Sequence, residues 1–173
     1  MIEHYKFKTK PYEHQLKALE ASWDKKTFAL FMEMGTGKSK VLIDNIALLY
    51  DKGDIRNVLI VAPKGVYRNW YEIEVPTHLP EHIEHTTVLW EPNLTQSKLK
   101  ELDALSQNDG KLKIFIMNVE AFSTNKGVDF AEKFLNTSVG RSLIGIDEST
   151  TIKNPTAKRT KSILKLRDFA EYR

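Results

Sequence analysis

The stretch Met32-Glu33-Met34-Gly35-Thr36-Gly37-Lys38-Ser39 decides the fold expected of this chain. An apolar run at 28–32 leads into it, and a run with helical apolar spacing, 41–49, follows it. This order predicts a buried strand, then a glycine loop, then a helix that opens with the Lys-Ser pair. Strand, glycine loop and helix in this arrangement are the layout of a phosphate-binding loop.

The residue types in this stretch suit phosphate binding for separate physical reasons. Gly35 and Gly37 let successive backbone N–H groups point at one centre, where a side chain would block the phosphates. The helix that follows adds its unpaired N–H groups and its positive dipole end. Lys38 can reach the β- and γ-phosphates, and the Ser39 hydroxyl can bind Mg²⁺. The predicted phosphate-binding residues are Met34, Gly35, Thr36, Gly37, Lys38 and Ser39.

The match to the strict phosphate-loop pattern is incomplete, because that pattern has glycine where this chain has Met32. The alternative interpretation is an ordinary glycine turn followed by a solvated lysine.

Composition limits the class of protein further. A chain of 173 residues with 41% hydrophobic residues is long enough and apolar enough for one domain with a real core. No apolar run approaches the length of a membrane span, and no secretory signal opens the sequence. Cysteine is absent, which excludes disulfides and thiolate zinc sites. We therefore expect residues 1–173 to form a single intracellular, monomeric domain without a membrane partner.

Strand and helix patterns alternate along the whole chain. The expected strands are mostly continuous apolar runs, which are typical of a parallel sheet covered on both faces. This alternation predicts an α/β fold, a three-layer α/β/α sandwich with a mostly parallel sheet. The expected strands are Phe28–Met32, Val58–Ala62, Thr87–Trp90, Ile114–Asn118 and Leu143–Asp147, and the expected helices are Tyr12–Trp23, Lys38–Tyr50, Val66–Glu74, Gln96–Ser106, Phe130–Leu135 and Thr156–Phe169.

A second set of candidate catalytic residues ends the last expected strand. Asp147 and Glu148 follow the apolar run 143–146. At the tip of a buried strand, Asp147 would hold Mg²⁺ and Glu148 would polarise the attacking water. An exposed Asp-Glu turn is the alternative. The glycine loop about a hundred residues upstream favours the first interpretation, because together the two motifs make an ATP and Mg²⁺ site.

The motifs resemble those of one protein family. The stretch 147–155, Asp-Glu-Ser-Thr-Thr-Ile-Lys-Asn-Pro, is similar to motif II of superfamily-two helicases and translocases, in the form used by the Swi/Snf-type branch. The Glu-Met-Gly opening of the glycine loop is similar to motif I of that branch. Pro11-Tyr12-Glu13-His14-Gln15 resembles its adenine-recognition motif, which implies that Gln15 reads the base. Without that resemblance Gln15 would be an ordinary solvated residue of a helix.

The same resemblance implies a nucleic-acid surface. The stretch 58–66 with Asn69-Trp70 looks like motif Ia, whose loop touches DNA, so Pro63, Lys64 and Gly65 are candidates. A lysine, a glycine and a helix N-terminus also suit phosphate binding, although a plain helix cap would use the same residues. The stretch 114–122 resembles the next motif, which places Asn118 and Glu120 near the DNA, with helix capping as the alternative. The implied partner is double-stranded DNA, with RNA less favoured.

The resemblance covers Pro11 to Arg173 and implies an N-terminal RecA-like ATPase domain of a helicase or translocase. Motif II carries Thr150 where the family usually has histidine, which puts coupling between the ATP and DNA sites in question. A second RecA-like domain with an arginine finger is implied but absent from this sequence. We therefore expect a fragment of a longer protein that, alone, hydrolyses ATP slowly or not at all.

Two other functions remain open. A binding or adaptor module that keeps the motor fold without hydrolysis, and docks on DNA or a protein, would also fit the shortness of the chain and the altered motif II. A kinase or GTPase is less favoured, because no Asn-Lys-x-Asp motif is present.

Overall fold

The computed structural model describes residues 5–22, 38–137, 141–146 and 161. Two expected elements, the strand Phe28–Met32 and the helix Thr156–Phe169, therefore lie outside the described residues, apart from Lys161. The described strands are β1 (Asn57–Ala62), β2 (His85–Leu89), β3 (Leu112–Asn118) and β4 (Ser142–Ile146). The described helices are α1 (Glu13–Ser22), α2 (Lys38–Lys52), α3 (Tyr67–Asn69), η2 (Trp70–Glu74), α4 (Val75–His78), α5 (Gln96–Ala104), η3 (Val119–Ser123) and α6 (Asn125–Asn136).

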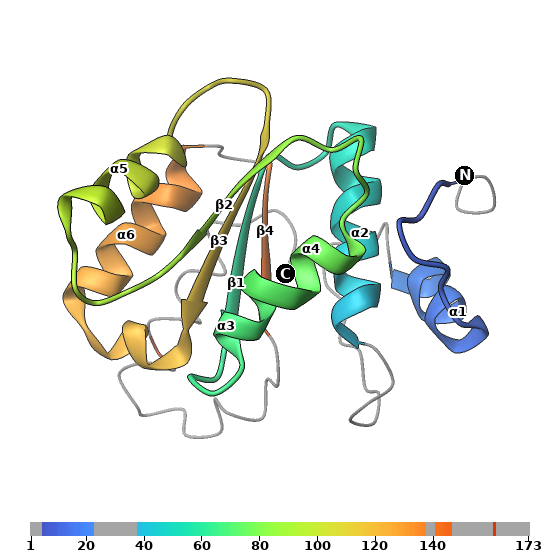
Figure 1. Cartoon of the computed structure of the whole chain (residues 1–173), viewed down its shortest axis with the longest axis horizontal. Helices are drawn as coiled ribbons and strands as arrows, with labels where there is room; N and C mark the ends of the chain where they lie inside the picture. The colour runs from blue at the N-terminus through green and yellow to red at the C-terminus, as the bar shows by residue number, and fades with distance from the viewer. Residues whose placement is uncertain (1–4, 23–37, 138–140, 147–160, 162–173) are drawn as a thin grey trace.

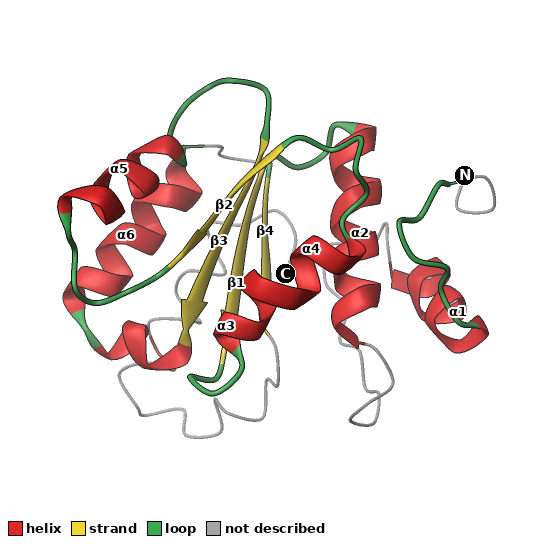
Figure 2. Cartoon of the chain, viewed as in Figure 1, coloured by secondary structure: helices red, strands yellow, loops and turns green. Residues whose placement is uncertain are grey.

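The strands form a parallel sheet in the order β2-β3-β1-β4 within the described part of the chain. Helices α5 and α6 cover one face of the sheet, and α2 with the α3–α4 helix covers the other (Figure 1). Figure 2 shows the same three layers, with α1 lying outside α2. The predicted three-layer α/β/α sandwich is therefore confirmed. None of the described helices is long and apolar enough to cross a membrane.

Side chains of the central strands alternate between two cores. In β1, Val58 and Ile60 join the core beneath α2, whereas Leu59 and Val61 join the core beneath α5 and α6. Every residue of β1 and of β3 is buried. Successive residues of a strand point to opposite faces, so a sheet covered on both sides needs apolar residues at every position. This is the physical reason that continuous apolar runs predicted these strands.

The helix after β1 extends further than the sequence predicts. Expected at Val66–Glu74, it runs from Tyr67 to His78 through a π-helical stretch, Trp70–Glu74, in which the N–H of Val75 donates to the carbonyl of Trp70. Pro76 lies inside this helix. A proline ring has no N–H and collides with the carbonyl four residues earlier in a regular helix. The wider π turn directly before Pro76 relieves that crowding.

Helix α6 is longer than the expected Phe130–Leu135 because it is capped upstream. The Thr124 hydroxyl accepts a hydrogen bond from the N–H of Gly127 at 3.1 Å. Threonine at a helix N-cap satisfies one of the unpaired N–H groups of the first turn. Apolar spacing alone does not reveal this first turn, whose residues Asn125 and Lys126 are exposed.

Gly127 is held between α6 and η3 with no room for a side chain. A Cβ atom added there would overlap the backbone carbonyl oxygen of Ala121, which cannot move as a side-chain end can. We expect Gly127→Ala to lower the free energy of unfolding by about 1–3 kcal/mol, measured by urea denaturation. Gly65→Ala is the control, since no atom of the described residues lies within 4 Å of its Cβ position. Equal stability of the two variants would contradict this packing.

Candidate nucleotide and nucleic-acid site

The N-terminus of α2 lies at the edge of the sheet where the strands end. Figure 1 shows the first residues of α2 at the end of the sheet where β1 and β3 finish. Lys38 is the first residue of α2, and Ser39, the second, is half-buried. The rest of the predicted phosphate loop, Met34 to Gly37, lies outside the described residues. The helix end itself has the orientation that phosphate binding requires.

Helix α2 also lies directly on the carboxyl end of β4. A Cβ atom built on Gly145 would be 2.7 Å from Cδ2 of Leu42. Leu42 lies one turn after Lys38, and Gly145 lies two residues before Asp147. The contact therefore brings the first turns of α2 and the end of β4 side by side, with the glycine allowing the close approach. Asp147 and Glu148 lie outside the described residues, so their meeting with Lys38 stays a prediction.

Gln15, the predicted adenine-reading residue, is buried in the first turn of α1. Its side chain accepts a hydrogen bond from the backbone N–H of Tyr12, at 2.8 Å to Oε1, and only 5% of the residue is exposed. This is one half of a capping box, so the side chain holds the start of the helix. The described contact of Gln15 is therefore a structural one, and base recognition by this residue stays a prediction.

The predicted DNA-facing residues come together at the ends of two neighbouring strands. Ala62, the last residue of β1, pairs with Asn118, the last residue of β3. The loop with Pro63, Lys64 and Gly65 thus emerges beside Asn118. The carbonyl of Pro63 accepts hydrogen bonds from the N–H groups of Val66 and Tyr67, at 2.9 and 3.0 Å, which folds the loop into the start of a helix. Lys64 and Gly65 are exposed.

Asn118 does not act as a helix cap through its side chain. It occupies the N-cap position of η3 but makes no capping hydrogen bond. Instead its Nδ2 donates to Oε2 of Glu120 at 3.1 Å, and its Oδ1 is buried without a partner in the described part of the chain. Glu120 is exposed and would repel a phosphate, so its geometry suits orienting Asn118 better than contacting DNA.

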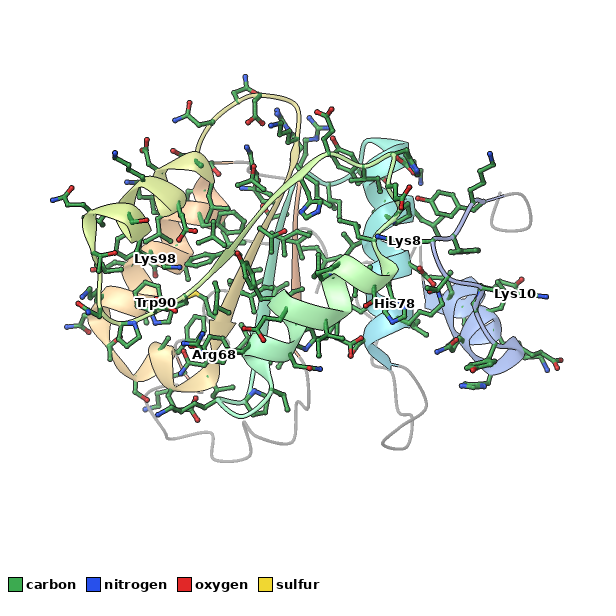
Figure 3. The ribbon with its side chains drawn as sticks, viewed as in Figure 1. Lys8, Lys10, Arg68, His78, Trp90 and Lys98 are labelled. Atoms are coloured by element: carbon green, nitrogen blue, oxygen red, sulfur yellow. The ribbon has the colours of Figure 1, made fainter. Side chains whose placement is uncertain are left out.

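Arg68 is a further candidate that the sequence analysis did not single out. It lies one turn after Lys64, about half of its side chain is exposed, and it pairs with Glu91 at 3.3 Å. Its guanidinium also lies 5.8 Å from the centre of the Tyr67 ring. Figure 3 labels Arg68 beside α3, which follows the loop after β1. The spacing of a second basic residue four positions after Lys64 is the signal that could have revealed it.

A buried ion pair inside α2 was also not predicted. Nζ of Lys40 lies 2.8 Å from Oδ2 of Asp44, and their side chains are 5% and 1% exposed. Burial raises the pKa of Asp44 to about 6, although the hydrogen bond and charge of Lys40 act in the opposite direction. The other carboxylate oxygen of Asp44 is buried with no partner in the described part of the chain. A Lys-Asp pair at positions i and i+4 in an apolar helix was the available signal.

The raised pKa of Asp44 predicts how stability depends on pH. The folded state holds this proton more tightly than the unfolded state, so the Asp44 contribution is fully present below pH 3.8 and is lost as pH rises through about 6. In urea denaturation, we expect the stability of the protein relative to Asp44→Asn to fall over this range and then level off. Each pKa unit corresponds to about 1.4 kcal/mol. A constant difference between the two proteins would contradict the shift.

The parallel sheet, with a helix beginning at its carboxyl edge, defines a RecA-like α/β domain. Residues 14–170 match the SNF2-related domain family, and the chain belongs to that family. The resemblance to Swi/Snf-type ATPases, as an N-terminal domain, is thereby confirmed.

A solved structure supports the assignment of the fold. The chain is similar to the SWI2/SNF2 ATPase core of Sulfolobus solfataricus, whose structure is a complex with double-stranded DNA, with a TM-score of 0.64 and 19% identity. The match covers 92% of this chain and 30% of that chain, so this chain spans less than a third of the length of its structural neighbour. No curated protein gives a significant sequence match.

Proposed function

We propose that this chain is the ATP-binding motor domain of a Swi/Snf-type translocase or helicase that acts on double-stranded DNA. The observation that carries the proposal is the packing of Leu42 on Gly145, which brings the start of α2 beside the end of β4. These are the two places from which the predicted phosphate-binding and catalytic residues emerge. Membership of the SNF2-related family supports assigning phosphate binding to the glycine loop and catalysis to the motif after β4.

The chemistry of the residues fits ATP with Mg²⁺. A helix N-terminus with Lys38 offers N–H groups and positive charge to the phosphates, and the Ser39 hydroxyl with the Asp147 carboxylate offers the oxygen ligands that Mg²⁺ prefers. When bound, Mg²⁺ supplies charge neutralisation on the phosphates. Glu148 takes the proton of the attacking water, while Gln15 contacts the adenine edge. The hydrogen bond from the N–H of Tyr12 to the amide oxygen of Gln15 holds that side chain in one orientation.

The proposed DNA surface comprises the loop after β1 and the end of β3. Lys64 is exposed and is the residue proposed to contact a DNA phosphate. Arg68, one turn further along, adds a second positive charge. Pro63 and Gly65 shape the loop, and Asn118 lies beside it at the end of β3. The complex of the Sulfolobus ATPase core with double-stranded DNA motivates the choice of duplex DNA as the partner.

The domain needs a second RecA-like domain for rapid hydrolysis. Charge on the transferring phosphate is stabilised from two sides, and an arginine finger contributes on the order of 10³–10⁵ in rate. Residues 1–173 are proposed to be one such half, which binds ATP and hydrolyses it slowly. Full motor activity then arises when two domains close around the nucleotide.

Two titrations test the proposal. Calorimetry with Mg-ATP should show binding to the chain, with GTP binding more weakly. Binding of a short DNA duplex should weaken with salt, and Lys64→Ala should reduce the slope of log K against log salt by about one. DNA or protein binding without any Mg-ATP binding would favour the adaptor module instead. Binding of neither ligand would contradict the motor function and leave only an adaptor that docks on a protein.

A further inference from the structure

Residues 5–10, called here the N-terminal strap, cross from α2 to α4 before the chain enters α1. At one end the Tyr5 hydroxyl donates to Oδ2 of Asp51 at 2.6 Å, near the end of α2. At the other, Oγ1 of Thr9 lies 2.7 Å from Nδ1 of His78, and Nζ of Lys8 donates to the carbonyl of Pro76 at 2.7 Å. Figure 3 labels Lys8 and His78 where the strap meets α4. The strap is thus tied to both helices.

The buried Lys40–Asp44 pair lies beneath the middle of the strap. Nζ of Lys40 lies 5.4 Å from the centre of the Phe7 ring and makes a cation–π contact with it. The same ammonium donates a hydrogen bond to Asp44. Both contacts are directional, since the ammonium must lie over the ring face and within bonding distance of one oxygen. They therefore fix the position of Phe7 along α2 more narrowly than apolar packing does.

The apolar contacts that hold α1 on α2 are less directional. Leu19 of α1 packs on Val41 and Leu48 of α2, with the strap residues Tyr5 and Phe7 against the same cluster. Apolar contact is non-directional and tolerates sliding. A buried ion pair is weak support for stability, and its best attested use is to set registry. The strap runs into α1 only three residues after Lys10, so its position sets where α1 begins and where Gln15 lies.

We propose that Lys40 and Asp44 are positioning residues for adenine recognition, acting through Phe7 and the strap on Gln15. This inference rests on the proposed role of Gln15. Neither residue contacts the nucleotide; together they hold the base-reading side chain at a fixed place relative to the N-terminus of α2. Losing them should reduce discrimination between ATP and GTP while leaving the fold intact.

The test compares Kd values of fluorescent ATP and GTP analogues for the chain and its variants. The double variant Lys40→Met/Asp44→Leu replaces both charged side chains by apolar ones. The fold should be kept, because neither charge is left buried without its partner, as it would be in a single variant. We expect the preference for ATP to fall about 2- to 10-fold, as for a misplaced hydrogen bond, with an unchanged melting temperature. Thr9→Val, which removes the anchor on His78 without touching α2, should act in the same direction.

The control is another buried lysine, Lys113, which lies at the opposite end of the sheet and pairs at 2.8 Å with the exposed Asp109. Lys113→Met should leave the preference for ATP unchanged. A normal preference in both folded strap variants, or an equal loss in Lys113→Met, would overturn the inference. Gln15→Ala separates the two claims. If it alone lowers the preference, only the positioning role fails; if it has no effect, base reading by Gln15 fails and the positioning role with it.

Discussion

Alanine at Lys38 is expected to weaken Mg-ATP binding about 10- to 100-fold. The ammonium would otherwise contact the β- and γ-phosphates, and a hydrogen bond to a charged group is worth about 1.5–3 kcal/mol. The backbone N–H groups that remain at the start of α2 carry only partial charge, so they replace the ammonium poorly. Calorimetric titration of the 173-residue chain with Mg-ATP measures the change directly.

Lys133→Ala is the matched comparison for that experiment. Lys133 is an exposed lysine of α6, on the face of the sheet away from α2. Its removal changes the net charge equally without approaching the proposed site. If the two variants bound Mg-ATP with the same affinity, the phosphate-binding role of Lys38 would be excluded. Circular dichroism of both proteins shows whether the fold is unchanged.

Phe115→Ala is expected to have the largest effect on stability. Phe115 is fully buried at the centre of β3, with its ring centre 5.5 Å from that of Phe134 and 6.3 Å from that of Trp90, both in edge contacts. Truncating a buried aromatic ring costs about 3–5 kcal/mol. For a domain of this size each kcal/mol lowers Tm by about 2–4 °C. Thermal and urea denaturation should agree on the loss.

Phe115 also lines a partly open pocket of about 260 Å³ between α5 and α6, and loss of its ring would enlarge this pocket. Tyr12→Ala is the control, since 71% of Tyr12 is exposed and its loss should change stability by less than about 0.5 kcal/mol. A loss below 1 kcal/mol at Phe115 would mean that the core can collapse around the gap.

The sheet and its three layers were predictable because strands that are buried on both faces are continuous apolar runs in the sequence. Runs such as 58–62 and 114–118 are apolar apart from the terminal Asn118, and each matches a strand to within one or two residues. Helix ends were less predictable. The extension of α6 depends on the Thr124 cap, and the passage of a helix through Pro76 depends on a π turn, neither of which apolar spacing encodes.

The candidate site was predictable in part for a similar reason. Chemically distinctive residues such as Lys38 and Gln15 follow recognisable patterns. The pairing of β1 with β3, which brings Pro63 beside Asn118, came from the structure. The roles of Lys40 and Asp44 were hidden, because a lysine and an aspartate on a helix usually face water. Their burial depends on the strap folding back over α2, a contact between residues more than thirty positions apart.

The π turn at Trp70–Glu74 contains one residue more than a regular α-helical turn would. Ile73, on the outer side of that turn, is 53% exposed, whereas Trp70 and Val75 on either side of it are buried. If Ile73 were deleted, the turn could become a regular α-helical turn while Trp70 and Val75 still faced the core. Pro76 would then have to fit into regular helix, where its ring finds no space. The widened turn and the proline are therefore interdependent, and a change in chain length here would need a matching change at position 76.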